Sequence, residues 1–278
     1  METKSKIISG TYHAKKIRES IKATPGAKPH LAIVLVGDDP ASKIYIAHKE
    51  KACNEVGIGF SLHALPATAT QEAVLALIHE LNQDPGTHGI LVQQPLPLHI
   101  NTMAVVTAVL PTKDVDCLHP YNLGLVAAGE GKVLPGTPAG IITMLKEENI
   151  PIAGKQAVVL GRSNIVGKPM ALMLLRENAT VTICHSQTQN LQEICARADI
   201  LVVAIGKAKY ITADYVKPGA VVIDVGTNRT PDGVCGDVDF EAVEEKAAYI
   251  TPVPGGVGPM TIATLLQNCM RVNEGNFS

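Results

Sequence analysis

Short apolar runs rich in Val, Ile and Leu alternate with segments of helical period almost throughout this chain of 278 residues. Runs of this kind are typical of parallel strands whose two faces are both covered by helices. The pattern therefore predicts the α/β class. The expected strands are 31–37, 60–65, 89–93, 157–161, 180–185, 199–206, 220–226 and 249–253, and the clearest helices between them are 42–56 and 70–83.

The chain is long enough for two domains, since a single core seldom grows much beyond this size. A segment rich in Gly and Pro near residues 119–137 marks the expected boundary. We therefore predict two α/β lobes flanking a cleft, with domains at 1–118 and 119–258. The last amphipathic stretch, about 259–278, could pack on either lobe, including back on the first. Thr137 and Pro138 form a good N-cap and first-turn pair for a helix that follows.

Composition and charge exclude several classes of partner. The net charge is −2 and the basic residues form no block, which argues against nucleic acid. No apolar run is long enough to span a bilayer and no signal peptide is evident, so we expect a cytoplasmic protein without membrane contact. The six cysteines lie far apart without a C-x-x-C pair, which indicates buried thiols in a reducing compartment and no metal site.

The stretch VVLGRSNIVGKPM, at 158–170, places two glycines and a lysine in a turn between a strand and a helix. A P-loop is excluded, because five residues separate Gly161 from Gly167 and Lys168 precedes a proline instead of Ser or Thr. A dinucleotide loop fits the context, since glycines admit a pyrophosphate to a helix N-terminus, although Ser163 stands at the usual second glycine. An ordinary strand-to-helix turn stays open as the alternative.

The end of the next strand favours NADP over NAD. A NAD site usually has a carboxylate there for the ribose 2′-hydroxyl, whereas this chain has CHSQT at 184–188. Arg162 and Ser186 could instead bind a 2′-phosphate. The alternative for Arg162 is a solvated surface arginine.

The first half carries a second candidate constellation. Tyr45 and Lys49 are four residues apart and so share one helical face. Gln93 ends an apolar strand, where a cleft is expected, and Asp116 lies in a loop before the domain boundary. A base, an amide and a carboxylate could converge there; alternatively, Lys49 belongs with its neighbouring lysines, 43 and 51, to an ordinary polar face.

With these motifs in place, the chain resembles the bifunctional methylenetetrahydrofolate dehydrogenase/methenyltetrahydrofolate cyclohydrolase family over essentially its whole length. The matching stretches, in order, are ASKIYIAHKEKACNEVGI, GILVQQPLP, KDVDCLHPYN, GRSNIVGKP, VVIDVGTNR and TPVPGGVGPMT. The resemblance implies oxidation of 5,10-methylenetetrahydrofolate by NADP, and then hydrolysis of the methenyl product to 10-formyltetrahydrofolate in the same cleft. It also implies a Rossmann-like second domain and a homodimer.

The resemblance assigns roles to individual residues. Lys49 is the expected general acid/base of hydrolysis, Tyr45 packs against the folate, Gln93 holds Lys49, and Asp116 anchors the pterin. The expected cofactor-binding residues are Gly161, Arg162, Ser163, Gly167, Ser186 and Thr227. The expected substrate-binding residues are Tyr45, Gln93 and Asp116 with Pro254, Gly255 and Gly256, whose loop could equally be a Pro/Gly hinge.

Four positions depart from the usual family pattern: Gln94, Cys117, Gly136 and Thr227 stand where Leu, Gly, Cys and Ile are common. None of them removes a proposed catalytic group. Two other functions stay open: another two-lobed NADP oxidoreductase such as a shikimate dehydrogenase, and a catalytically silent dinucleotide-binding sensor. Neither of these needs the set formed by Tyr45, Lys49, Gln93 and Asp116.

Overall fold

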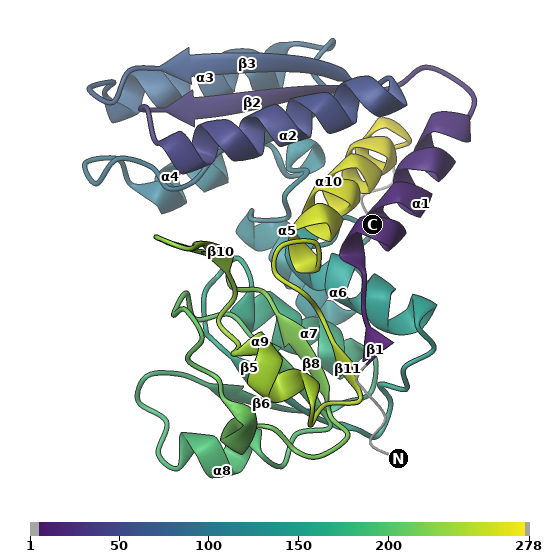
Figure 1. Cartoon of the computed structure of the whole chain (residues 1–278). Helices are drawn as coiled ribbons and strands as arrows, with labels where there is room; N and C mark the ends of the chain where they lie inside the picture. Colours follow the sequence, from purple (N-terminus) through teal and green to yellow (C-terminus); the bar gives the residue numbers. More distant parts are fainter. Residues whose placement is uncertain (1–5, 276–278) are drawn as a thin grey trace. The chain divides into compact units, whose positions relative to one another are not determined.

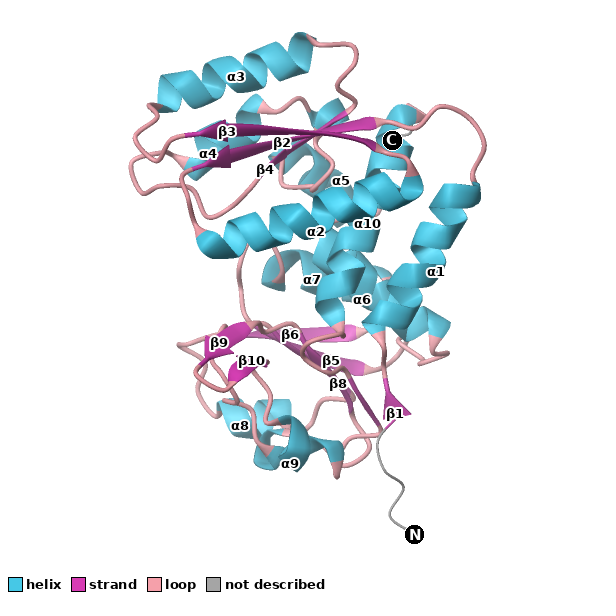
Figure 2. Cartoon of the chain, turned by 45° about the horizontal axis from the view of Figure 1, so that its top comes forward, coloured by secondary structure: helices cyan, strands magenta, loops and turns pink. Residues whose placement is uncertain are grey.

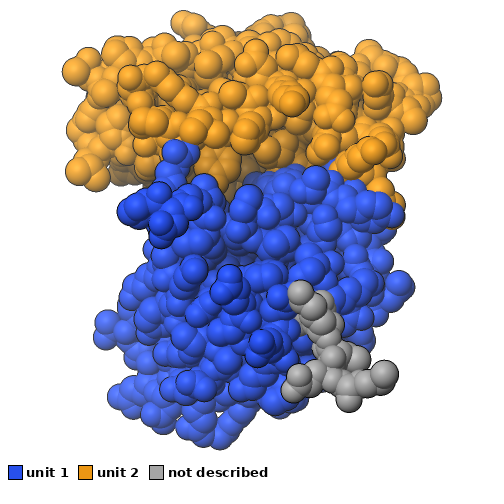
Figure 3. Space-filling view, in the orientation of Figure 1, with its two compact units in different colours: residues 1–14, 137–261 blue, residues 15–136, 262–278 orange. Residues whose placement is uncertain are grey.

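In the computed structural model, which describes residues 6–275, the chain passes repeatedly between two units. Figure 3 colours these units separately: unit 1 comprises the described part of 1–14 with 137–261, and unit 2 comprises 15–136 with the described part of 262–278. Each unit is built around its own parallel sheet. The predicted α/β class is confirmed.

The division differs from the predicted domains 1–118 and 119–258. Residues 119–136 belong to unit 2, and residues 6–14 belong to unit 1. The physical reason for the second difference is strand β1 (Lys6–Ile7), which pairs with β11 (Tyr249–Ile250) at the edge of the unit 1 sheet. The predicted domain ends at 1–5 and 276–278 lie outside the described residues.

Unit 2 contains a three-stranded parallel sheet with the order β3-β2-β4. In Figure 2, helices α2 and α3 lie on opposite sides of this sheet. Alternate residues of β2 explain the arrangement: Ala32, Val34 and Val36 belong to a buried cluster that includes residues of α3 and α4. The elements are α1 (Gly10–Ala23), which begins in unit 1, then β2 (His30–Val36), α2 (Pro40–Val56), β3 (Gly59–Leu65), α3 (Gln71–Gln83), β4 (Gly89–Val92), α4 (Thr102–Ala108), η1 (Pro111–Lys113) and α5 (Pro120–Ala128).

Unit 1 contains a six-stranded parallel sheet with the order β1-β11-β8-β7-β5-β6. Helices α6 and α7 lie on one side of it, and α8 and α9 on the other (Figures 1 and 2). The strand order reverses at β5, as in Rossmann-like folds. The elements are α6 (Gly136–Glu147), β5 (Gln156–Leu160), α7 (Gly167–Arg176), β6 (Thr180–Cys184), α8 (Leu191–Cys195), β7 (Ile200–Val203), η2 (Ala213–Tyr215), β8 (Val221–Asp224), the antiparallel pair β9 (Asn228–Thr230) and β10 (Gly233–Cys235), and α9 (Phe240–Glu244).

Each predicted strand and both named helices are present, with bounds that differ by a few residues. The predicted boundary segment near 119–137 contains helix α5 at 120–128, capped by the side chain of His119, which accepts from the Tyr121 N–H. The division between the units falls at the end of this segment, between 136 and 137. The prediction of Thr137 as an N-cap was wrong. Helix α6 begins at Gly136, so Thr137 lies inside its first turn and its hydroxyl pairs with that of Thr261 at 2.8 Å.

Helix α10 (Val257–Asn273) is the last helix of the described residues, and the division between the units falls within it, after Thr261. Its residues 262–273 belong to unit 2, as expected if the last amphipathic stretch packs back on the first lobe. The helix contributes buried side chains to unit 2, among them Leu266, Asn268 and Cys269.

Candidate functional site

In unit 2, an amine and an amide side chain from different elements form a direct hydrogen bond. Lys49, on α2, donates from Nζ to Oε1 of Gln93 at 2.9 Å, and Gln93 immediately follows β4. The Gln93 amide nitrogen in turn donates to the carbonyl oxygen of Gln94 at 2.7 Å. This second bond fixes the amide so that its oxygen, the acceptor, faces the lysine.

Asp116 is electrostatically coupled to this pair. Burial lowers the pKa of Lys49 below its ordinary value, while the negative charge of Asp116 acts to raise it. Burial likewise raises the pKa of Asp116, and the charge of Lys49 opposes that rise. Lys49, Gln93 and Asp116 all retain partial exposure, so the group is desolvated but accessible. An amine with a lowered pKa is suited to proton transfer near neutral pH.

The neighbouring lysines of α2 behave differently. Lys43 is exposed and pairs with Asp38, and Lys51 is exposed. Lys49 therefore does not belong to an ordinary polar face. Tyr45, one turn before Lys49, keeps 39% of its surface exposed, which leaves its ring available to a ligand.

In unit 1, the predicted cofactor residues lie at the carboxyl edge of the sheet. Gly161 follows β5, Ser186 follows β6, and Thr227 follows β8. Strand β5 is bonded to β6 on one side and to β7 on the other, and ligands of open α/β sheets bind where the strand order reverses in this way.

Two glycines are required by close backbone contacts in this loop. Gly161 has a φ of 129°, and a Cβ there would lie 2.3 Å from the carbonyl oxygen of Ala204. A Cβ on Gly167 would lie 2.2 Å from the carbonyl oxygen of Gly161. The glycines thus bring the turn, the end of β7 and the start of α7 together, so that the N-terminus of this ten-residue helix lies at the carboxyl edge of the sheet.

The remaining predicted cofactor residues divide into one that caps the turn and three that are exposed. The hydroxyl oxygen of Ser163 accepts from the N–H groups of Val166 and Gly167 at 3.1 and 3.3 Å, so this residue caps the turn before α7. Its hydroxyl hydrogen is left to donate to a ligand. Arg162, Ser186 and Thr227 are exposed, and no carboxylate follows β6 before Thr188. The donor set fits a dinucleotide with a 2′-phosphate.

Two buried carboxylates beside this edge escaped the sequence-based prediction. Asp237 is fully buried and accepts from the backbone N–H groups of Ile205, Gly206 and Lys207 at 2.7–2.9 Å, which fixes the turn after β7. Asp224, at the end of β8, accepts from the N–H of Gly226 at 2.9 Å. Burial raises the pKa of Asp224 to about 6, despite its backbone donors. An aspartate directly after the apolar run VVI was the only available signal.

The loop that contains Pro254, Gly255 and Gly256 belongs to unit 1. Gly255 has a φ of 101°, and its carbonyl oxygen accepts from the Thr11 N–H at 3.0 Å. A Cβ on Gly256 would lie 2.4 Å from the carbonyl oxygen of Pro252. The glycines here allow a tight turn against the start of α1, and this backbone packing explains them without a ligand.

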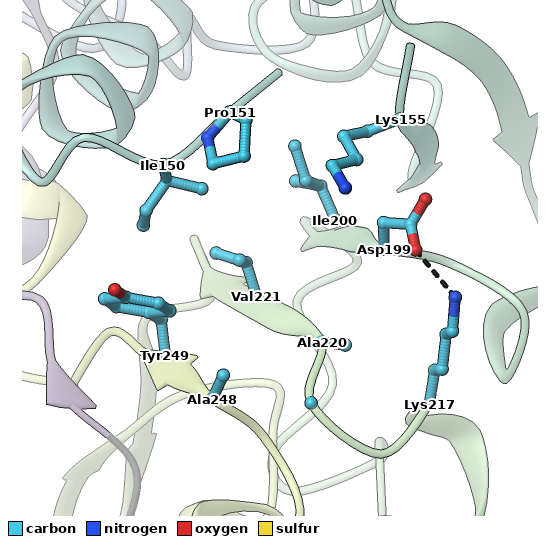
Figure 4. A pocket seen from close by; sticks show the side chains of 11 residues that line it. Ile150, Pro151, Lys155, Asp199, Ile200, Lys217, Ala220, Val221, Ala248 and Tyr249 are labelled. Carbon is cyan, nitrogen blue, oxygen red and sulfur yellow. Dashed lines mark hydrogen bonds and ion pairs between the residues drawn. The ribbon is translucent and has the colours of Figure 1, made fainter. Parts of the chain in front are cut away.

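Figure 4 shows a pocket of unit 1, which lies at the amino ends of the strands, whereas the glycine loop follows the carboxyl end of β5. Ile200, Val221 and Tyr249 line it, and each is the first residue of its strand. Lys217 pairs with Asp199 across its rim at 2.7 Å. Because these residues mark the amino ends of the strands, this pocket is separate from the dinucleotide loop.

Residues 6–275 offer no metal centre and no membrane span. No group of three or more His, Cys, Asp or Glu in this range could hold a metal ion. No helix in the described part of the chain is long and apolar enough to cross a membrane. The cysteines are all free thiols.

Comparison with known proteins divides the chain into two matched segments. The family description "Tetrahydrofolate dehydrogenase/cyclohydrolase, catalytic domain" matches residues 8–116, and the corresponding NAD(P)-binding domain matches residues 135–277. The chain is similar to the bifunctional protein FolD of Geobacillus thermodenitrificans, with 56% identity over 274 residues that cover 96% of each protein.

Solved structures agree. The FolD methylenetetrahydrofolate dehydrogenase/cyclohydrolase of Campylobacter jejuni has a TM-score of 0.95 and 45% identity, covering 98% of this chain and 100% of that one. The Trypanosoma brucei FolD, crystallised with NADP cofactor and an inhibitor, has a TM-score of 0.93 and 36% identity, covering 98% of both chains. A shikimate dehydrogenase of Thermus thermophilus, with a TM-score of 0.56 and 18% identity over 89% of this chain and 93% of that one, shares the fold alone.

Proposed function

Because the chain belongs to the tetrahydrofolate dehydrogenase/cyclohydrolase family, we propose that it oxidises 5,10-methylenetetrahydrofolate with NADP and hydrolyses the methenyl product to 10-formyltetrahydrofolate. The observation that carries this proposal is the Lys49–Gln93 hydrogen bond, coupled to Asp116, in the segment that matches the catalytic domain. A silent dinucleotide-binding protein would have no use for this group.

Lys49 is the proposed proton-transfer residue of hydrolysis. Its neutral amine takes one proton from water as the oxygen attacks the methenyl carbon. The resulting ammonium gives that proton to the ring nitrogen as the bond between this nitrogen and the carbon breaks, and the hydroxyl proton of the intermediate is released to solvent as the formyl carbonyl forms. Burial favours the neutral form that the first step needs, and Gln93 holds the amine in place through its fixed oxygen. Acid–base catalysis of this kind contributes about 10²–10⁴-fold.

Asp116 and Tyr45 are the proposed folate-binding residues of unit 2. A carboxylate can accept two parallel N–H bonds from the aminopyrimidinone edge of a pterin. The exposed ring of Tyr45 offers a flat apolar surface one helical turn from Lys49. We also propose Pro254, Gly255 and Gly256 as folate contacts, on the family resemblance.

The proposed cofactor is NADP, which accepts the hydride when it is bound. Gly161 and Gly167 leave room for the pyrophosphate at the start of α7, and Ser163 can donate its free hydroxyl hydrogen. Arg162 and Ser186 are proposed to bind the 2′-phosphate, with Thr227 beside the nicotinamide. No protein base is needed for hydride transfer, so orientation of the two reactants is the main contribution of the chain.

A homodimer and a cytoplasmic location are also proposed. The dimer rests on family resemblance, and sedimentation at assay concentrations would test it, since a monomer would contradict it. The location is supported by the six free cysteines, which suit a reducing compartment.

A single assay tests the proposed activities. The protein is mixed with methylenetetrahydrofolate and NADP while NADPH and methenyl absorbance are followed together. We expect NADPH to accumulate and the methenyl signal to decay faster than in an enzyme-free control. A shikimate dehydrogenase would instead reduce NADP only with shikimate, and a silent sensor would bind NADP without turnover.

A further inference from the structure

The loop that carries Asp116 is fastened on both sides of that residue by buried side chains. We propose that Asn268 and Cys117 are positioning residues for Asp116, which hold its carboxylate where the pterin binds. This inference rests on the folate-binding role proposed for Asp116. All the groups concerned belong to unit 2.

Asn268, on α10, has no exposed surface and a complete set of hydrogen bonds. Its Nδ2 donates to the carbonyl oxygens of Val115 at 2.9 Å and Leu134 at 2.7 Å. Its Oδ1 accepts from the N–H of Leu134 at 3.3 Å and from Arg271 at 3.1 Å. The Val115 carbonyl belongs to the peptide group that joins Val115 to Asp116, so Asn268 fixes the backbone directly before Asp116.

Cys117 fixes the backbone directly after Asp116. Its φ is 57°, in the left-handed region that non-glycine residues rarely adopt. The side chain is 1% exposed, and its thiol donates to the carbonyl oxygen of Val133 at 3.3 Å. Asn268 and Cys117 therefore tie the two sides of Asp116 to the same segment, Val133–Leu134.

A third buried side chain, that of Asp114, bonds to the backbone of the same loop. Asp114 is 4% exposed and accepts from the N–H groups of Leu118 and His119 at 3.2 and 2.8 Å. The backbone around Asp116 is thus held at several points, while Asp116 as a residue stays partly exposed. Because the amide atoms of Asn268 are all engaged with the protein, Asn268 can act on folate only through Asp116.

The test is a double-mutant cycle between Asn268→Leu and Asp116→Ala. We expect Asn268→Leu to raise the KM for methylenetetrahydrofolate roughly tenfold, as loss of a buried hydrogen-bonding group predicts, with the KM for NADP unchanged. In the Asp116→Ala background, the same change should add less than about twofold, because the residue being positioned is already gone. A merely structural role would lower the melting temperature and the fraction of active enzyme without this selective change in KM.

Thr264→Val provides a matched control on the same helix. Thr264 is also buried, at 1% exposed, and its hydroxyl has no hydrogen-bond partner among residues 6–275. Its removal should leave the KM for folate unchanged. If Asn268→Leu fails to fold, Cys117→Ala and Cys117→Ser still decide the matter: alanine should raise the folate KM several-fold, whereas serine, which keeps a donor, should restore it.

The outcomes separate the inference from the function on which it rests. An unchanged folate KM in Asp116→Ala overturns the role of Asp116, and the positioning inference with it. A raised KM in Asp116→Ala with a wild-type KM in both Asn268→Leu and Cys117→Ala overturns the inference alone. Full additivity in the double mutant also overturns it.

Discussion

The candidate site of unit 2 is built from side-chain functional groups, whereas that of unit 1 depends on closely packed backbone. In unit 2, three side chains with nitrogen or oxygen groups are partly buried together, and burial changes the pKa of two of them. In unit 1, the decisive feature is the absence of side chains, since a Cβ on Gly161 or Gly167 would overlap a carbonyl oxygen. Chemistry that moves protons needs tuned functional groups, whereas a site that only holds and orients a cofactor can be built from backbone.

Lys49→Gln should have the largest effect and tests the side-chain half of this comparison. The substitution removes the amine while keeping much of the side chain's volume. We expect cyclohydrolase activity to fall by about 10²–10⁴-fold. Dehydrogenase activity should fall less, because hydride transfer does not use the lysine's proton. NADPH formation and methenyl decay are measured in parallel, with thermal melting as the folding control. Unchanged methenyl decay would remove Lys49 from the mechanism.

Arg162→Ala tests the one charged side chain assigned to the cofactor in unit 1. Loss of a charge-assisted hydrogen bond should weaken the binding of NADP by about 10–100-fold and leave the binding of NAD nearly unaffected. Arg197→Ala is the matched control, because Arg197 is an exposed arginine of the same unit that pairs with Glu193. Equal losses for NADP and NAD would contradict recognition of the 2′-phosphate.

Gly161→Ala tests the backbone half of the comparison. A side chain there meets both a φ of 129° and the Ala204 carbonyl, so we expect NADP binding to weaken by about tenfold or more. Gly219→Ala is the control, because Gly219 has a φ of 78° with open space around its Cβ position. Gly219→Ala should lower the stability of the protein without affecting its affinity for NADP. Equal NADP affinities in the two variants would show that the close approach at Gly161 is unimportant.

The smallest expected effect concerns the electrostatic interaction between Lys49 and Asp116 in unit 2. The negative charge of Asp116 acts to raise the pKa of Lys49, so Asp116→Asn should lower the pKa of Lys49 further. The neutral amine would then persist to lower pH, and the rising limb of the cyclohydrolase pH profile should move to lower pH. NMR titration of the Lys49 side chain in the folate-free protein checks the shift directly. A pKa that stays the same or rises would show that the two groups do not interact.

The sequence was most informative where one residue type implies one environment. Continuous runs such as AIVLV predicted buried parallel strands, because no amphipathic alternative fits them. It was less informative at 119–137, where Pro and Gly indicated a domain boundary and the helix that Pro120 begins and Gly129 ends, with a φ of 86°, was missed. Pro at the start and Gly at the end are common at helix termini as well as in loops, so composition alone could not distinguish a short helix from a loop.

The site showed the same limit. Lys49, Gln93 and Asp116 could be nominated from motifs, but their bond and coupling depend on tertiary placement. Asp237 and Asn268 were missed because their partners are mostly backbone groups distant in sequence. Asn268 lies in the largely apolar stretch LLQNCM, where an amide predicts nothing unless its buried partners are known.

The division within α10 has a consequence for recombination between relatives. An exchange of the NADP-binding unit by one contiguous graft, such as 135–277, would also replace Asn268, which bonds to Val115 and Leu134 of unit 2. The interchangeable module is instead a discontinuous pair of segments, 1–14 and 137–261. Viable chimaeras should therefore carry a seam inside the last helix, with the recipient's own 262–278 left in place.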